Sequence, residues 1–179
     1  IVDIGVPAEE VRRGIATWRL EAADARPLFP PRAADAHKGR LGHLLVVAGS
    51  LGKTGAAVLA GRAALRAGVG LCTIAAPGSQ QPIIATQAPE YMTEALPETP
   101  ARSLARAARD RVLELARGMD AVALGPGLSL DPETQELART LVRGLDRPMV
   151  VGADALGVLA GHLDSLRDAG GRRAQGPPR

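Results

Sequence analysis

Residues 37–77 read HKGRLGHLLVVAGSLGKTGAAVLAGRAALRAGVGLCTIAAP, and this stretch decides the fold. The apolar run 44–48 has the length and composition of a strand buried on both faces. The glycine-rich turn after it leads into a helix that we expect to run to about Ala67, with Thr54 as its cap. A second strand is predicted over 69–75. Strand, helix and strand in this order form a parallel βαβ unit, which places ligands at the carboxyl ends of its strands.

The turn itself, GSLGKT at 49–54, matches neither common phosphate-binding motif. A P-loop needs a glycine at position 47, where Val47 stands, and the fingerprint G-x-G-x-x-G fails because Gly49 and Gly52 are three apart. Together with Gly55, these glycines either let backbone approach a ligand closely or only make a tight strand-to-helix turn.

Composition limits the kind of protein. The chain has 179 residues, enough for one domain with a sizeable core or for a fragment of a larger one. Hydrophobic residues make up 46% and aromatic residues only 2%, so the core must be built from Ala, Val, Leu and Ile. The net charge of +3 suits an anionic partner, but Arg and Ala are abundant throughout and aromatic residues for base stacking are lacking. We therefore expect no nucleic-acid partner.

Cysteine usage and hydropathy indicate the compartment. Cys72 is the single cysteine and lies in a predicted buried strand, which excludes an intramolecular disulfide and suits a reducing cytosol. No apolar run has the length of a membrane span, and the N-terminus does not read as a signal peptide. We expect a cytoplasmic protein without a membrane partner.

The rest of the chain alternates helices and strands. After a proline-rich, irregular segment 77–100, a helix is predicted over 101–117, where four apolar residues share a face. In the segment 77–100, a short helix could start at 83–85, and 89–92 is either a ligand-side loop or a short extended piece. The apolar residues of the helix are Leu104, Ala108, Val112 and Leu115.

The last predicted elements follow the same alternation. A strand over 120–124 ends in the turn 125–127, and Asp131 caps a helix that begins at Pro132 and runs to about Arg143. A strand is predicted over 148–151 and a short helix from Gly152 to Leu156.

This pattern predicts a parallel α/β sheet with helices on both faces. The right-handed crossover rule places the turns after Ala48, Leu124 and Val151 on one edge of that sheet. Because each of the three turns carries glycine, we expect a ligand site at this edge.

Four segments together resemble the ADP/ATP-dependent NAD(P)H-hydrate dehydratases: residues 37–71, PEYM at 89–92, ALGPGLS at 123–129 and VVGADAL at 150–156. The resemblance covers roughly residues 37–160. It implies a ribokinase-like three-layer α/β/α fold with a mostly parallel sheet, incomplete at the C-terminus. Residues 37–179 would be the N-terminal part of the dehydratase domain. Residues 1–36 would be a linker and the tail of an epimerase-like domain, to which Ile1–Pro7 belongs.

The resemblance also implies a reaction. Hydrated NADH or NADPH is dehydrated at the expense of ADP or ATP with Mg²⁺, by phosphorylation of the ring hydroxyl and loss of phosphate pushed by the ring nitrogen. The enzyme would be a homo-oligomer. The family's Gly-Thr-Gly-Asp segment, which supplies an anion hole and the catalytic Asp, is not found in this sequence. We therefore expect the catalytic Asp to lie beyond Arg179 and the chain alone to lack dehydratase activity.

Four residues are the predicted substrate-binding set, and no metal ligands are predicted. By position, Ala56 and Gly127 match residues that hold the hydrated nucleotide in the family, and Gly55 adjoins Ala56. Asp154 is a candidate to orient water, Mg²⁺ or a substrate hydroxyl. The plainer alternatives are helix packing for Ala56 and, for Asp154, a carboxylate that stabilises a helix N-terminus by ~0.5 kcal/mol.

The sequence departs from the family at three positions and leaves two other functions open. Gly152 replaces the first Asp of an Asp-Ala-Asp-Ala-Leu segment, Gly157 stands where Asn is common, and Lys53 stands where an apolar or aromatic residue is usual. The alternatives are a sugar or vitamin kinase of the same superfold and a non-catalytic nucleotide-binding fragment.

Overall fold

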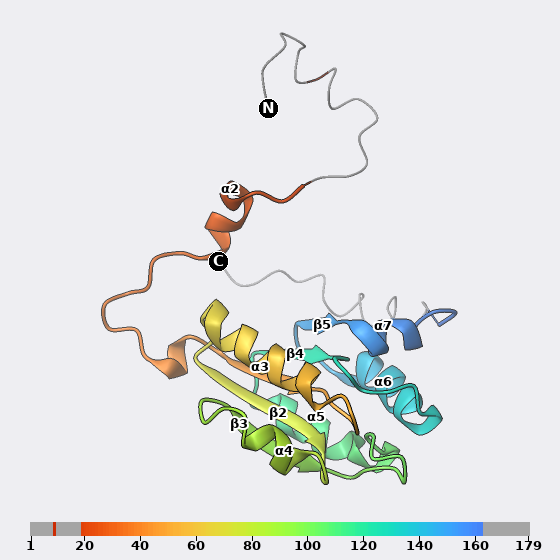
Figure 1. Cartoon of the computed structure of the whole chain (residues 1–179). Helices are drawn as coiled ribbons and strands as arrows, with labels where there is room; N and C mark the ends of the chain where they lie inside the picture. Colours follow the sequence, from red (N-terminus) through yellow and green to blue (C-terminus); the bar gives the residue numbers. More distant parts are fainter. Residues whose placement is uncertain (1–8, 10–18, 163–179) are drawn as a thin grey trace. The chain divides into compact units, whose positions relative to one another are not determined.

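A computed structural model describes residue 9 and residues 19–162 of the chain (Figure 1). Contacts divide the chain into two units, Ile1–Ala36 and His37–Arg179. In the first unit, the structure describes a short helix α2 (Ala22–Ala25) and a 3₁₀ turn η1 (Arg26–Leu28). The proposed tail Ile1–Pro7 lies outside the described residues.

The second unit alternates strands and helices, as the sequence predicts (Figure 1). Its strands are β1 (His43–Val47), β2 (Leu71–Pro77), β3 (Met92–Leu96), β4 (Ala121–Leu124) and β5 (Met149–Val151). Its α-helices are α3 (Thr54–Ala67), α4 (Gln81–Ala85), α5 (Arg109–Arg117), α6 (Pro132–Gly144) and α7 (Ala153–Val158). Two 3₁₀ turns, η2 (Lys38–Arg40) and η3 (Arg106–Ala108), precede β1 and α5.

The five strands form one parallel sheet in the order β3-β2-β1-β4-β5. The central strand β1 pairs with β2 on one side, His43 opposite Leu71, and with β4 on the other, Leu44 opposite Ala121. All carboxyl ends of the strands therefore lie at one edge, as the crossover rule predicts.

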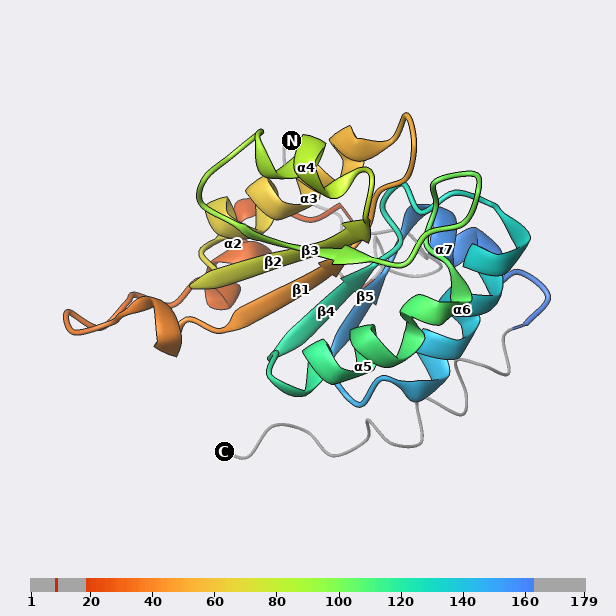
Figure 2. The same ribbon diagram turned by 90° about the horizontal axis from the view of Figure 1, so that it is seen from below.

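Helices cover both faces of the sheet, which confirms the three-layer prediction (Figure 2). Helices α3 and α4 pack on one face around a core that includes Val46, Ile74 and Ile84. Helices α5, α6 and α7 pack on the other face around a larger core that includes Leu45 and Leu124. Consecutive residues of β1 belong to opposite cores, because side chains alternate across a strand.

Local signals explain most helix boundaries. Asp131 accepts hydrogen bonds from the amides of Glu133 and Thr134, which confirms it as the cap of α6. Helix α3 ends where predicted, at Gly68 with φ of +108°, a conformation that glycine adopts without a Cβ penalty. The predicted cap of α3 is wrong, because Thr54 is already helical and Lys53 precedes it without a side-chain cap.

Two further predictions are corrected. The segment 77–100, predicted to be irregular, contains strand β3. The predicted helix 101–117 begins only at η3 and α5, because residues 99–104 form a turn in which the Thr99 amide donates to the Ser103 carbonyl oxygen at 2.8 Å. Leu104 is fully buried as expected, although it lies before the helix.

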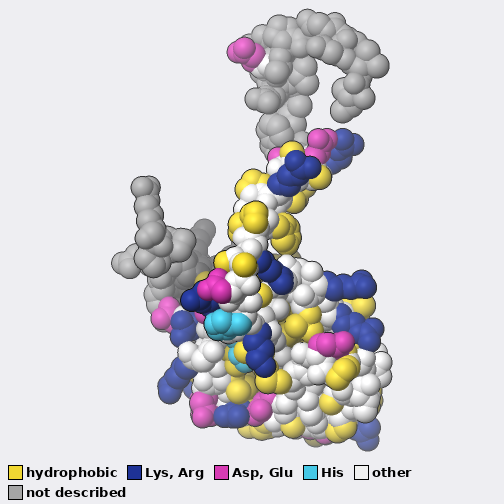
Figure 3. All heavy atoms as spheres, turned by 90° about the vertical axis from the view of Figure 1, so that its left-hand side faces the viewer, with side chains coloured by type: hydrophobic (Ala, Val, Ile, Leu, Met, Phe, Trp, Pro, Cys, Tyr) yellow, Lys and Arg dark blue, Asp and Glu magenta, His cyan; other side chains and the backbone are white. Residues whose placement is uncertain are grey.

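The surface carries both signs of charge. On the face drawn in Figure 3, Lys and Arg side chains lie among Asp and Glu side chains. Arg111 illustrates this mixing, since it pairs with Glu94 and with Glu114 at 2.8 Å each. Within the described residues, no helix combines the length and the apolar character needed to cross a bilayer.

Candidate functional site

The turns that follow β1, β3 and β4 meet at the carboxyl edge of the sheet. The Gly49 amide donates to the Pro126 carbonyl oxygen at 2.9 Å, which joins the turns after β1 and β4. The Leu51 amide donates to the Arg102 carbonyl oxygen at 3.1 Å, which joins the turns after β1 and β3. These two backbone hydrogen bonds hold the glycine-rich turn after β1 between the turns that follow β3 and β4.

Ala56 and Gly127 lie against each other at this edge. Gly127 has φ of +66°, and a Cβ added there would lie 3.0 Å from the Ala56 Cβ and 2.8 Å from the Lys53 carbonyl oxygen. The buried Ser50 hydroxyl donates to the Gly127 carbonyl oxygen at 2.8 Å. The turn after β4 therefore packs so closely on the start of α3 that only glycine fits at position 127.

Gly55 presents open backbone beside this contact. It lies exposed in the first turn of α3, and a Cβ added there would meet no atom within 4 Å. A Cβ added to Gly52, whose φ is +76°, would also meet no atom within 4 Å. The beginning of α3 is thus accessible next to the closely packed Ala56.

Asp154 joins the group through two hydrogen bonds. Its Oδ2 accepts from the Lys53 Nζ at 3.0 Å and from the Ser129 amide at 2.8 Å. Partial burial by itself would raise the pKa of Asp154, but the hydrogen bonds from Lys53 and Ser129 and the Lys53 charge outweigh it, so the pKa lies below its ordinary value. The carboxylate is ionised and is a weak proton acceptor.

All four predicted residues thus come together, while their roles toward a ligand stay predictions. Ser50 and Ser129 also join this group although no sequence pattern indicates them, and Lys53 is marked in the sequence only as a departure from the family. The unusual residue type at position 53 was the one signal that pointed to this ion pair. Ser50 and Ser129 gave no signal, because their roles depend on contacts between turns distant in sequence.

Backbone strain is concentrated at the same edge. Three described residues other than glycine have positive φ, and all three follow strand ends: Arg102 at 56°, Ser129 at 85° and Ala153 at 46°. Such conformations cost of order 1 kcal/mol or more each and persist only where the surroundings impose them. Strain of this kind clusters at ligand sites.

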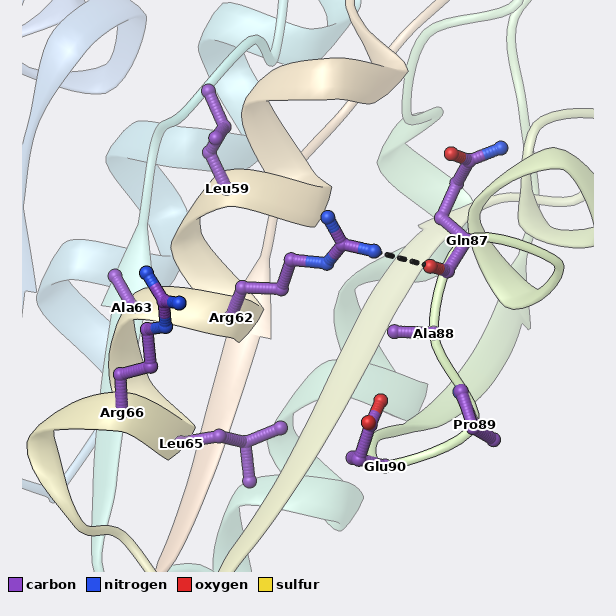
Figure 4. A pocket seen from close by; sticks show the side chains of 9 residues that line it. All are labelled: Leu59, Arg62, Ala63, Leu65, Arg66, Gln87, Ala88, Pro89 and Glu90. Atoms are coloured by element: carbon purple, nitrogen blue, oxygen red, sulfur yellow. Dashed lines mark hydrogen bonds between the residues drawn. The ribbon is translucent and has the colours of Figure 1, made fainter.

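Of the two alternatives for residues 89–92, the ligand-side loop is wrong, and the extended piece is correct only for Met92, where β3 begins. Because β3 runs parallel to β2, residues 89–91 precede its start and lie at the amino edge. A cavity of about 670 Å³ lies there between α3 and the segment 87–90 (Figure 4). In it, the Arg62 Nη2 donates to the Gln87 carbonyl oxygen at 2.6 Å, and none of the four predicted residues lines it.

Candidate metal ligands do not cluster among the described residues. Across residues 19–162, no three His, Cys, Asp or Glu side chains gather as a ligand set. Asp154 is the carboxylate that joins the predicted residues, and the Lys53 ammonium 3.0 Å away disfavours a second cation there.

Comparison with known proteins agrees with the resemblance. A family model described as NAD(P)H-hydrate dehydratase matches residues 44–172. The bifunctional NAD(P)H-hydrate repair enzyme Nnr of Moorella thermoacetica is 47% identical over 161 residues, which cover 89% of this chain and 30% of that protein. The chain spans about a third of the length of the Nnr enzymes that it matches.

Solved structures show the same fold. The ADP/ATP-dependent NAD(P)H-hydrate dehydratase of Bacillus subtilis, co-crystallised with ATP/Mg²⁺, is 29% identical with a TM-score of 0.56, covering 75% of this chain and 45% of that chain. A ribokinase-like superfamily protein of Enterococcus faecalis, 18% identical with a TM-score of 0.61 over 73% of this chain and 43% of its own, supports the fold alone. The chain therefore belongs to the NAD(P)H-hydrate dehydratase family.

Proposed function

We propose that this chain supplies the binding site for the hydrated nicotinamide nucleotide in an ADP- or ATP-dependent NAD(P)H-hydrate dehydratase. The observation that carries the proposal is the close packing of Gly127 on Ala56 beside the open backbone of Gly55. The small residues at 56 and 127 let the two turns meet, and the free space at Gly55 beside them leaves room for a flat ring or a phosphate. The names of the relatives and their ATP/Mg²⁺ complex support the reaction and its cofactors.

Asp154 would accept a hydrogen bond from a hydroxyl of the ligand. It does not suit the role of the base that takes the proton from the substrate hydroxyl, because its lowered pKa makes it a poor acceptor. We assign the base and the Mg²⁺ ligands to parts of the enzyme other than the described residues, so no catalytic step is assigned to Asp154.

Membership in the dehydratase family favours this function over a sugar or vitamin kinase. A fragment that binds nucleotide without catalysis remains the second candidate, because the chain covers about a third of its relatives. Turnover of hydrated NADH with ADP or ATP and Mg²⁺, followed by the absorbance of the reduced nicotinamide, separates the two. Turnover at the rate of a full-length relative would show that the catalytic groups lie within this chain.

The assembly is also part of the proposal. We expect residues 1–36 to be a linker and the end of an epimerase-like domain, and the enzyme to be a cytoplasmic homo-oligomer. The fully buried Cys72 suits a reducing compartment. Size-exclusion chromatography with light scattering tests the oligomer.

The binding site is tested by Ala56→Trp. We expect the indole to fill the space for the ring and to weaken binding of hydrated NADH by roughly 100-fold, or about 2.7 kcal/mol. Ala63→Trp is the matched control, because Ala63 is exposed on the same helix and lines the cavity at the other edge. Equal affinity of Ala56→Trp and the unmodified chain, measured by calorimetry, would make Ala56 a packing residue.

A further inference from the structure

Lys53 departs from the residue type usual in the family, and it forms an ion pair with Asp154. It is one of two lysines in the chain, and it reaches across 101 positions of sequence to Asp154. The ion pair joins the beginning of α3 to the beginning of α7, and through Ser129 it also joins the turn after β4.

The two oxygens of the Asp154 carboxylate have different surroundings. Both donors, Lys53 Nζ and the Ser129 amide, contact Oδ2. No described residue donates to Oδ1. The carboxylate is therefore fixed through one oxygen, while the other is left to accept a hydrogen bond from a ligand.

The backbone on both sides of the ion pair is strained. Ser129 and Ala153, on either side of the Ser129–Asp154 hydrogen bond, both have positive φ without being glycine. Ser129 lies two residues after Gly127, so the hydrogen bond to Asp154 adds a third attachment to the turn that the Gly49 amide and the Ser50 hydroxyl also hold. A hydrogen bond to an ionised carboxylate is stronger than one to a neutral acceptor.

We infer that Lys53 is a positioning residue, which fixes Asp154 so that Oδ2 holds the Gly127 turn and Oδ1 faces the ligand as a fixed acceptor. The part concerning the ligand rests on the proposed function, and the part concerning the turn does not. The side chain of Lys53 is 46% exposed and that of Asp154 26%. Ion pairs so exposed to water add little to stability, so loss of the pair is expected to change binding more than folding.

The test compares Lys53→Met, Lys53→Arg, Asp154→Asn and the double variant Lys53→Met/Asp154→Asn in the full 179-residue chain. Lys38→Met is the matched control, since the other lysine precedes β1 at the amino edge. Affinity for hydrated NADH is measured by calorimetry, and the Ser129 amide proton is followed by NMR. Thermal unfolding reports the fold of each variant.

We expect Lys53→Met to weaken binding about tenfold, which is 1.4 kcal/mol, and to move the Ser129 amide proton upfield. Lys53→Arg is expected to restore both, because it keeps the charge. The double variant is expected to bind no more weakly than Asp154→Asn alone, since Lys53 acts through Asp154. Lys38→Met is expected to match the unmodified chain.

The outcomes separate this inference from the proposed function. Absence of binding by the unmodified chain would count against the proposed function, and the Ser129 amide would still decide whether Lys53 positions Asp154. An unchanged Ser129 amide in Lys53→Met would overturn the inference. Unchanged affinity in Lys53→Met, with normal binding by the unmodified chain, would also overturn it and leave the proposed function standing.

Discussion

Glycines lie at both the amino and the carboxyl edge of the parallel sheet, but their surroundings differ. At the amino edge, a Cβ added to Gly70 would lie 1.7 Å from the Lys38 carbonyl oxygen, so glycine there serves close packing. At the carboxyl edge, Gly52 and Gly55 have no atom within 4 Å of such a Cβ. Close packing also explains Gly127 at the carboxyl edge, and a φ of +76° explains Gly52, whereas neither explains Gly55. Gly55 therefore leaves its backbone accessible at the edge where we propose that the ligand binds.

The largest effect is expected at the amino edge, for Gly70→Ala. The added methyl group cannot avoid a backbone oxygen, so we expect a loss of about 3 kcal/mol or more in the free energy of unfolding. Urea denaturation followed by circular dichroism measures it. Cys72 provides a second measure, because burial raises the pKa of its thiol to about 11 and the native chain should react slowly with thiol reagents. A variant as stable as the parent would contradict the close packing of this edge.

A smaller effect of opposite sign is expected at the carboxyl edge, for Gly55→Ala. Because Gly55 is helical and has free space around its Cβ position, alanine should stabilise the fold by about 0.5–1 kcal/mol. The same methyl group should weaken binding of hydrated NADH by about tenfold. The two quantities come from urea denaturation and calorimetry. Higher stability with unchanged affinity would remove Gly55 from the site.

The smallest effects are pH-dependent and differ between the edges. At the carboxyl edge, the folded-state pKa of Asp154 lies below its ordinary value of 3.8, so its contribution is full above pH 3.8 and is lost as the pH falls through the folded pKa. At the amino edge, burial lowers the pKa of His43 below 6.5, against the raising influence of Asp120. Stability is therefore lost as the pH falls below 6.5, because the unfolded state binds the proton first.

Unfolding free energies of Asp154→Asn and His43→Gln, relative to the parent from pH 7 to pH 3, test this separation. Each effect is expected to be about 0.5 kcal/mol or less, because the groups are partly exposed. The difference in unfolding free energy between Asp154→Asn and the parent should vanish only below pH 3.8. The difference between His43→Gln and the parent should change at higher pH, below 6.5. Identical pH profiles for the two variants would contradict the assignment.

Sequence patterns predicted the sheet well where signals are local. Residues close in sequence suffice to recognise three features: the apolar run of β1, the cap of α6 at Asp131 and the end of α3 at Gly68. Strand β3 gives a weak signal because it is the outermost strand of the sheet, carries the exposed Met92 and lacks a continuous apolar run. The start of α5 was misplaced because the turn at 99–104 is held by hydrogen bonds that helical periodicity does not reveal.

That the four predicted residues lie near one another follows from the sequence, but the hydrogen bonds around them do not. Ala56, Gly127, Gly55 and Asp154 were found from the resemblance, and the parallel sheet places the turns that carry them on one edge. The unusual residue type at position 53 marks Lys53, but nothing local in the sequence identifies Asp154, 101 positions away, as its partner. The positive φ of Ser129 and Ala153 is likewise imposed by tertiary contacts, because neither residue type favours that conformation.

The position of β1 in the middle of the sheet has a consequence for the order of folding. Its pairing with β2 closes about 28 residues of chain, and its pairing with β4 closes about 77. By loop-closure entropy alone, pairing of β1 with β4 costs about 0.9 kcal/mol more than pairing of β1 with β2. It also requires that the chain between β1 and β4 has been made and has formed its helices. The nascent chain is thus expected to complete the glycine-rich turn and α3 before the turn of Gly127 is available to pack on Ala56.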